Sequence, residues 1–266
     1  MLLAIDIGNT NTKIAIFRGK KIFRIWRLVT KKACTIKQEQ KLLKRFLFQN
    51  KSSQSRIDEI IICSVVPKLT SVFEQALFLL FKKRPLILGK NIFVPIKNLY
   101  KKPKQVGQDR LVNAVAAVSK YGGPVIVVDF GTAVTFDVIS KTGSYLGGVI
   151  VPGMEVSLRA LIECADLLPK IKLGKPSTVL GRDTVSSMKS GIIFGYSFLV
   201  EGILQQLRKK LKKRFKVVAT GGAAGLMFRY CKSIQKIDEN LTLEGLMLAY
   251  ERMKIGKKQQ KADDFS

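Results

Sequence analysis

Histidine is absent from the 266-residue chain, and its absence excludes several kinds of chemistry. No Ser-His-Asp or Cys-His catalytic arrangement can form, so any general base must be a carboxylate or a lysine. Cysteine is scarce: Cys34, Cys63, Cys164 and Cys231 lie far apart and form no Cys-x-x-Cys pair. We therefore expect neither disulfides nor a zinc site built from cysteine and histidine.

Long hydrophobic runs are missing as well. No apolar stretch is long enough to cross a bilayer without interruption. The N-terminal segment reaches Asp6 and Asn9 before it shows the basic start, apolar middle and small-residue cleavage site that a secretory signal needs. The sequence therefore predicts a cytoplasmic protein that does not associate with membranes.

Acidic residues are few: 19 Asp and Glu stand against 47 Lys and Arg, a formal net charge of +28. Such a charge suits phosphate backbones, and a basic nucleic-acid-binding module with steeply salt-dependent affinity is one alternative. However, the basic residues are scattered through predicted loops and helix ends, without aromatic residues interleaved along a strand. We expect no specific nucleic-acid partner.

Hydrophobic residues make up 47% of the chain, enough for the cores of two domains. Alternating or β-branched apolar runs predict strands at residues 2–7, 12–17, 21–28, 59–64, 125–129, 134–139, 145–151 and 216–220. Apolar spacings of three and four predict helices at residues 37–47, 69–81, 110–119, 153–164, 186–211 and 241–253. Residues after Gly256 are polar, and we expect them to fray.

A Gly-Gly-Pro break at 122–124 separates two segments that open alike. One opens with an apolar strand and Asp6-Ile7-Gly8, the other with an apolar strand and Asp129-Phe130-Gly131; a threonine and a second strand follow in both. This pattern predicts an internal duplication of one hairpin, with a cleft between the copies. The expected organisation is an α/β protein with domains at 1–121 and 122–256 and a polar tail at 257–266.

A glycine at the tip of a tight hairpin lets backbone N–H groups approach a phosphate, and neighbouring threonine or asparagine side chains add donors. Ionised Asp6 and Asp129 only accept hydrogen bonds, so we expect them beside Mg²⁺, its waters or a monovalent cation. Lys13 would place a positive charge at a transferring phosphoryl group. One such turn is a weak signal because Asx turns use the same residues, but two copies after buried strands strengthen it. The chain lacks a Walker loop and a protein-kinase catalytic loop.

Two further glycine turns stay ambiguous on the residues alone. Gly107 precedes Gln108, Asp109 and Arg110 at the start of an apolar helix. Asp109 and Arg110 could cap this helix and face solvent, or they could accept a hydroxyl proton and fix a polar acceptor. The Thr-Gly-Gly turn at 220–222 could let an adenine lie against the backbone, although its residues favour a tight packing turn.

Taken together and in order, these residues resemble the acetate and sugar kinase, heat-shock protein and actin superfamily, and within it they closely resemble type III pantothenate kinases. The resemblance runs nearly end to end. It rests on Asp6-x-Gly8-Asn9-Thr10 with Lys13, Tyr100-x-x-Pro103, Gly107-x-Asp109-Arg110, Asp129-x-Gly131-Thr132-Ala133-x-Thr135-x-Asp137, Gly147-Gly148-x-Ile150-x-Pro152-Gly153, Gly181-x-x-Thr184, Ser190-Gly191 and Thr220-Gly221-Gly222.

The resemblance implies a fold of two duplicated actin-like, ribonuclease H-like domains with an ATP cleft between them. It implies ATP-dependent phosphorylation of the primary hydroxyl of pantothenate, the first step of coenzyme A biosynthesis. Mg²⁺ would accompany ATP, and K⁺ or NH₄⁺ would be the monovalent cation. The enzyme would be a homodimer.

The resemblance also assigns roles to residues. The first phosphate loop would comprise Asp6, Ile7, Gly8, Asn9, Thr10, Asn11, Thr12 and Lys13. Thr132 would belong to the second loop, Asp129 would hold the monovalent cation, and Asp109 would be the general base. Tyr100, Gly107, Gln108 and Arg110 would line the pantothenate pocket, which Thr184 would reach from the dimer partner or from a loop near the interface. A regulatory protein of the same fold and a kinase for another small acceptor remain alternatives.

Overall fold

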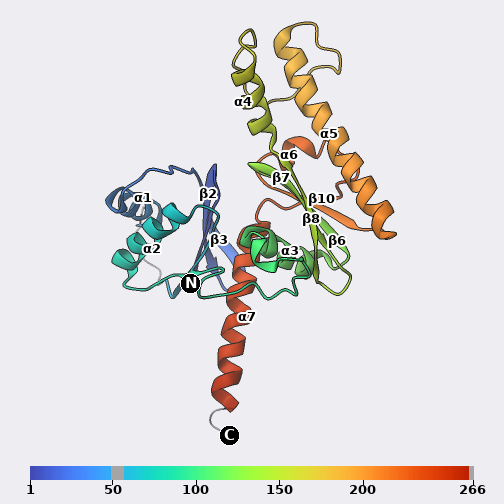
Figure 1. Ribbon diagram of the computed structural model, residues 1–266. Coiled ribbons are helices and arrows are strands. Elements are labelled where there is room, and N and C mark those ends of the chain that lie inside the picture. Colours follow the sequence, from blue (N-terminus) through green and yellow to red (C-terminus); the bar gives the residue numbers. More distant parts are fainter. Residues whose placement is uncertain (49–56, 264–266) are drawn as a thin grey trace. The chain divides into compact units, whose positions relative to one another are not determined.

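The computed structural model describes residues 1–48 and 57–263, which form two compact units. The first unit comprises residues 1–96, 102–116 and those from 241 onward, and the second comprises 97–101 and 117–240. Each unit contains one five-stranded sheet (Figure 1). Within the described residues, no helix is both long and apolar enough to span a membrane.

The first unit is built on a sheet of order β3-β2-β1-β4-β5. Strands β1, β2 and β3 are antiparallel neighbours, whereas β4 and β5 run parallel to β1. The strands are β1 (Leu2–Ile7), β2 (Asn11–Arg18), β3 (Lys21–Val29), β4 (Glu59–Ser64) and β5 (Leu86–Ile87). The helices are α1 (Ile36–Phe48), α2 (Pro67–Phe81), the 3-10 helix η2 (Pro103–Gln105), α3 (Gln108–Tyr121), whose last turn belongs to the second unit, and α7 (Leu241–Asp263).

Both faces of the first sheet are covered, and β1 therefore reads as an almost continuous apolar run. Alternate side chains such as Leu3 and Ile5 pack with α1 and α2 in one core cluster. Their neighbours Leu2 and Ala4 pack with α7 in another. Helices α1 and α2 lie side by side in Figure 1, in agreement with their mutual contacts.

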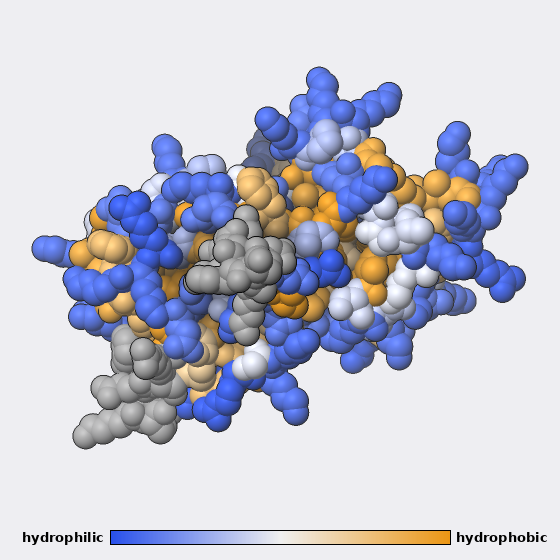
Figure 2. All heavy atoms as spheres, turned by 90° about the horizontal axis from the view of Figure 1, so that it is seen from below, coloured by the Kyte–Doolittle hydropathy of each residue, from blue (hydrophilic) through white to orange (hydrophobic). Residues whose placement is uncertain are grey.

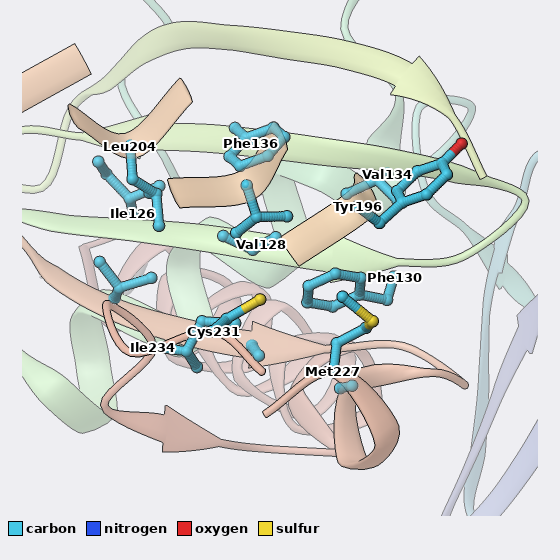
Figure 3. Packing of buried hydrophobic residues seen from close by; sticks show 14 of the residues in the cluster. Ile126, Val128, Phe130, Val134, Phe136, Tyr196, Leu204, Met227, Cys231 and Ile234 are labelled. Carbon is cyan, nitrogen blue, oxygen red and sulfur yellow. The ribbon is translucent and has the colours of Figure 1, made fainter. Parts of the chain in front are cut away.

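The second unit is built on a sheet of order β10-β9-β6-β7-β8. Its strands are β6 (Val125–Phe130), β7 (Ala133–Ile139), β8 (Tyr145–Pro152), β9 (Lys216–Thr220) and β10 (Lys236–Ile237). Its helices are α4 (Met154–Cys164), α5 (Thr184–Leu211) and α6 (Ala224–Met227). One face of this sheet is apolar, and Figure 3 shows Val128, Phe130 and Phe136 packed there near Tyr196 of α5 and Met227 of α6.

The two sheets have the same topology, which confirms the predicted duplication. In each, three antiparallel strands are followed in the sheet by two strands parallel to the first, so that β6 corresponds to β1, β7 to β2 and β9 to β4. The order of elements along the chain also repeats, with a helix before β4 and β9 and another before β5 and β10. The α/β fold class expected from the sequence is confirmed.

The structure differs from the sequence-based expectation at the C-terminus. Helix α7 continues to Asp263, although residues beyond 256 were expected to fray. Lys, Gln and Ala dominate this stretch, and they are good helix formers even where no apolar face is evident. The predicted boundary at 121 groups α7 with the second half of the chain, whereas its contacts are within the first unit. The last residues of the predicted tail, 264–266, lie outside the described residues.

The surface reflects the composition. Figure 2 shows one face on which hydrophilic side chains predominate, with hydrophobic atoms between them. Lysine and arginine account for 47 of the 266 residues, which explains the prevalence of hydrophilic side chains.

Candidate functional site

The first glycine turn joins β1 to β2 and is stabilised by hydrogen bonds within the turn and from Thr30. The Gly8 N–H donates to the Asn11 carbonyl at 3.0 Å, and a Cβ on Gly8 would come within 2.9 Å of that oxygen. The Thr30 hydroxyl donates to the Gly8 carbonyl at 2.8 Å and lies 2.9 Å from the hydroxyl of buried Thr12. The tip residues Asn9, Thr10 and Asn11 are exposed, so the turn presents backbone and side-chain donors to solvent.

Asp6 sits on β1 just before this turn, with two cross-strand neighbours. It faces Lys13 on β2 and Cys63 on β4 in the sheet register. The Cys63 side chain is fully buried, and burial is the main reason why the pKa of its thiol is raised. The charges of Asp6 and Asp109 raise that pKa further, so both carboxylates lie near the same sulfur.

Asp109 lies in the first turn of α3, directly after the Gly107 turn. Its Oδ1 accepts the Arg110 backbone N–H at 2.9 Å, and a Cβ on Gly107 would overlap the same oxygen. Burial raises the pKa of the Asp109 carboxyl, while the Arg110 N–H and guanidinium lower it in part. Gln108 packs against Gly89, whose φ of +79° suits glycine. The turn thus fixes a partly desolvated carboxylate within hydrogen-bonding distance of a backbone donor.

The second glycine turn joins β6 to β7 and is one residue shorter. The Gly131 N–H donates to the Ala133 carbonyl at 3.1 Å, and the Gly153 N–H donates to the Thr132 carbonyl at 3.0 Å. Gly153 is the N-cap of α4, and a Cβ there would overlap the carbonyl oxygens of Gly131 and Thr132. The close approach of α4 therefore shapes the turn and leaves Thr132 exposed at its tip.

Asp129 precedes this turn as Asp6 precedes the first, but its neighbours differ. It faces Thr135 on β7 and Thr220 on β9. Gly221 follows Thr220 with φ +92°, and a Cβ on Gly221 would overlap Asp129 Oδ1. Gly221 of the Thr-Gly-Gly turn therefore packs tightly against Asp129.

Tyr100 rests in the second unit on a polar arrangement that sequence reasoning did not assign. Its ring lies 6.5 Å, centroid to centroid, from Tyr145, whose hydroxyl donates to Asp137 Oδ1 at 2.8 Å. The Thr135 hydroxyl donates to Asp137 Oδ2 at 3.1 Å, and Asp137 is 0% exposed. A carboxylate within an otherwise apolar strand was the available signal, because a buried carboxylate needs partners. A Cβ on Gly147, with φ +139°, would lie 3.7 Å from the Tyr100 ring.

Thr184 is the first residue of α5 and is exposed. Asp183 caps this helix, with its Oδ1 accepting the Ser186 N–H at 2.9 Å. Figure 1 shows α4 and α5 extending beyond their sheet, with the first turn of α5 at the far end. Within its own unit, Thr184 is therefore separated from the Asp129 turn.

The predicted residues fall into three groups. The first unit brings together the loop from Asp6 to Lys13 with Asp109 and its neighbours through Cys63. The second unit holds Asp129 and Thr132 at its own turn, and Tyr100 beside Tyr145. Thr184 stands apart at the end of a projecting helix.

Comparison with known proteins adds a family. The profile of the type III pantothenate kinase family matches residues 2–206. A type III pantothenate kinase of Anaeromyxobacter sp. (strain K) is 42% identical over 252 residues, covering 95% of this chain and 99% of the relative. That of Geotalea daltonii is 44% identical over 253 residues, covering 95% and 98%. Among solved structures, the activator of 2-hydroxyisocaproyl-CoA dehydratase from Clostridium difficile, with bound ADPNP, has a TM-score of 0.56 at 12% identity and covers 97% of each chain. This last likeness is one of fold.

Proposed function

The chain belongs to the type III pantothenate kinase family, and from that premise we propose that it phosphorylates pantothenate with ATP, with Asp109 as the general base. The observation that carries the proposal is the placement of Asp109. Its carboxylate is partly buried, is fixed by the Gly107 turn, and lies in the same unit and near the same thiol as Asp6 of the phosphate loop.

Asp109 accepts the proton of the primary hydroxyl as that oxygen attacks the γ-phosphorus. The Arg110 backbone N–H donates to Asp109 Oδ1, so we assign the other oxygen, Oδ2, as the one that accepts the hydroxyl proton. Burial raises the pKa of the Asp109 carboxyl, which makes its carboxylate a better proton acceptor than that of an exposed aspartate. Because phosphoryl transfer needs little covalent chemistry from the protein, one base and well-placed charges are sufficient.

The two glycine turns act as phosphate-binding elements, one in each unit. The exposed N–H groups and side chains of residues 9–11 and of Thr132 donate to phosphate oxygens. Lys13, opposite Asp6, places its ammonium where negative charge develops. Mg²⁺ would accompany ATP and would supply positive charge to offset that of the phosphates.

Pantothenate is held by Tyr100, Gly107, Gln108 and Arg110. Arg110 suits its carboxylate because a guanidinium binds that group bidentately. The Tyr100 ring packs near the Tyr145 ring, which a hydrogen bond to Asp137 holds in place. Tyr100 therefore offers a fixed apolar face with a polar hydroxyl at its tip.

A monovalent cation, K⁺ or NH₄⁺, sits at Asp129. The residues around it fit such an ion, because the carboxylate is flanked in the sheet by the hydroxyl-bearing Thr135 and Thr220. The Thr220 hydroxyl is buried and lacks a hydrogen-bond partner among the described residues, which makes its oxygen available to a ligand.

The working enzyme is a homodimer to which Thr184 contributes across the interface. The second unit carries several large apolar side chains that are exposed, and their burial against a second copy would favour association. They are Ile150 at 61% exposure, Leu167 at 96%, Val179 at 67%, Leu180 at 75% and Phe198 at 71%. Thr184 begins the helix that carries Phe198 and lies at its projecting end.

The function is tested with Asp109→Asn. Phosphorylation of pantothenate by the purified protein should fall by about 10²- to 10⁴-fold, the range for a positioned base. Binding of ATP and of pantothenate, measured by calorimetry, should remain. Glu74→Gln is the control, because this carboxylate of the same unit only pairs with Lys90 at the surface of α2. Full turnover by Asp109→Asn would remove the base from the proposal, and no turnover by the folded parent protein would remove the activity.

A further inference from the structure

The duplication allows the two aspartates to be compared position by position. Asp6 and Asp129 each precede a glycine turn on equivalent strands, β1 and β6. On the neighbouring antiparallel strand, Asp6 faces Lys13, whereas Asp129 faces Thr135. The first copy therefore has a positively charged lysine at the sheet position where the second copy has a neutral threonine.

The strand on the other side differs as well. Asp6 is flanked on β4 by Cys63, and Asp129 is flanked on β9 by Thr220. A thiol is a soft and weak ligand, whereas a hydroxyl offers a hard oxygen with two lone pairs. The second copy thus places hydroxyl oxygens on both sides of its carboxylate, and the first copy does not.

The Thr220 side chain points to the face of the sheet that carries Asp129. Its chain neighbour Ala219 belongs to the apolar cluster on the opposite face, which contains Val128 and Phe130 from β6. Because successive side chains of a strand alternate, Thr220 and Asp129 share the remaining face. They lie directly opposite each other in the register of β9 and β6.

Of the two hydroxyl groups beside Asp129, that of Thr135 has a hydrogen-bond partner among the described residues and that of Thr220 does not. Thr135 Oγ1 donates to Asp137 Oδ2 at 3.1 Å. Thr220 is 1% exposed, and its Oγ1 has no hydrogen-bond partner within the described part of the chain. A buried hydroxyl left without a partner costs free energy, and a bound ligand removes that cost.

Gly221 fixes the geometry of this pair. Its φ of +92° turns the chain immediately after Thr220, so that the backbone closes over the Asp129 carboxylate. A Cβ at Gly131 would lie 3.5 Å from the same Oδ1, so glycines border this oxygen on two sides. The carboxylate is held in place, and no side chain of either glycine covers it.

We propose that Thr220 supplies its hydroxyl oxygen to the monovalent cation of Asp129, which takes the place that the Lys13 ammonium has in the first copy. This inference rests on the proposed cation site and adds a ligand to it. A carboxylate and a hydroxyl are hard oxygen donors of the kind that alkali and alkaline-earth cations prefer. Thr220 therefore sets the affinity and the selectivity of the site.

The test uses Thr220→Val, which keeps the shape of the side chain and removes the oxygen, and Thr220→Ser, which keeps the oxygen. The readout is the melting temperature of the full-length protein with Mg-ATP as K⁺ replaces choline at constant ionic strength. For Thr220→Val, the K⁺ concentration for half-maximal stabilisation should rise by about 10- to 100-fold, the usual cost of losing a group that supports a metal site. Thr220→Ser should stay within about threefold of the parent protein, because it retains the oxygen.

Ser197→Ala is the matched control. Ser197 is buried in α5, which packs on the opposite face of the same sheet, and its hydroxyl donates to the Phe194 carbonyl at 2.8 Å. Its loss should lower the melting temperature and leave the K⁺ midpoint unchanged. An unchanged midpoint in Thr220→Val, with a parent protein that responds to K⁺ and an Asp129→Asn variant that does not, would overturn the role of Thr220 alone. A parent protein without any K⁺ response would overturn the site at Asp129 as well, whereas the kinase proposal stands or falls on turnover.

Discussion

At the scale of single residues, burial and hydrogen bonding shift two aspartate pKa values in opposite directions. Burial raises the pKa of Asp109, whereas hydrogen bonds from Ser186 lower the pKa of Asp183 at the start of α5. A raised native pKa means that ionised Asp109 opposes folding, with a cost that appears as pH rises through that pKa. A lowered pKa means that ionised Asp183 favours folding, with a gain that is lost on acidification through its pKa.

Asparagine at the two positions should therefore have opposite effects. At pH 8, Asp109→Asn should raise the melting temperature and Asp183→Asn should lower it, because the first loses a desolvation cost and the second loses a negative charge at the N-terminus of α5. The difference for Asp109→Asn should shrink at pH 4, near the ordinary aspartate pKa, because protonation removes the desolvation cost, whereas the difference for Asp183→Asn should largely persist there, because the pKa of Asp183 lies below the ordinary value. Thermal melts of the three proteins at both pH values check this. A lower melting temperature for Asp109→Asn at pH 8 would contradict the desolvation argument.

Some site residues could be predicted individually, and others could not. Asp6, Asp129 and Asp109 stand next to glycines in short patterns, so a turn that carries a carboxylate was visible in the sequence. Cys63 gave no such signal, and Thr220 was visible only as part of a glycine turn; the sheet shows that each lies beside one of the aspartates. Sheet register depends on contacts between distant segments, and local patterns do not encode them.

At the scale of elements, α7 and α3 approach closely at Gly245 within the first unit. A Cβ on Gly245 would overlap the carbonyl oxygen and Cγ1 of Val112. Gly245→Ala should therefore lower the free energy of unfolding by about 1–3 kcal/mol through overpacking, despite the better helix propensity of alanine.

Gly256→Ala on the same helix is the control. Within the described part of the chain, no atom lies within 4 Å of a Cβ at this position, so alanine should be neutral or should stabilise the protein by up to about 1 kcal/mol. Urea denaturation of both variants gives the comparison. Equal effects of the two substitutions would mean that the contact with Val112 does not constrain the helix.

The longer elements were predictable because their side chains follow a regular period. Strand β4 has the predicted bounds Glu59–Ser64, and α5 begins two residues before the predicted 186 because Asp183 caps it. Strands β5 and β10 have two residues each, too few for any period to appear. Short edge strands of this kind form because a neighbouring strand is already in place.

At the scale of the whole molecule, the proposed contribution of Thr184 to its partner can be tested by mixing two defects. Asp109→Asn and Thr184→Ala homodimers should each have little activity, for different reasons. If the site is shared, a mixed dimer has one site with both defects and one with neither. Random assortment of equal amounts should then restore about one quarter of the parent turnover, since half of the dimers are mixed.

Co-purification of the two variants with different affinity tags isolates the mixed dimer for this measurement. Activity no greater than the average of the two homodimers would place Thr184 in the site of its own chain. A protein that sediments as a monomer at assay concentration would overturn the shared site altogether.

The duplication was accessible from the repeated turn, but the assignment of α7 was not. Leu243, Leu246 and Met247 would suit an apolar cluster in either unit, and only the tertiary contacts show that they pack with Leu2 and Ala4. The spacing of apolar residues shows that a helix has a buried face, but it does not show which part of the protein covers that face.

The return of α7 to the first unit has a consequence for biosynthesis. Residues 117–240 emerge from the ribosome as a nearly complete second unit, whereas the first unit needs residues from 241 onward to close one of its cores. Domains usually fold in the order in which they are translated. Here the unit whose strands are made first is completed last, because its apolar β1 face stays uncovered until α7 has been translated, and termination near residue 240 leaves that face exposed.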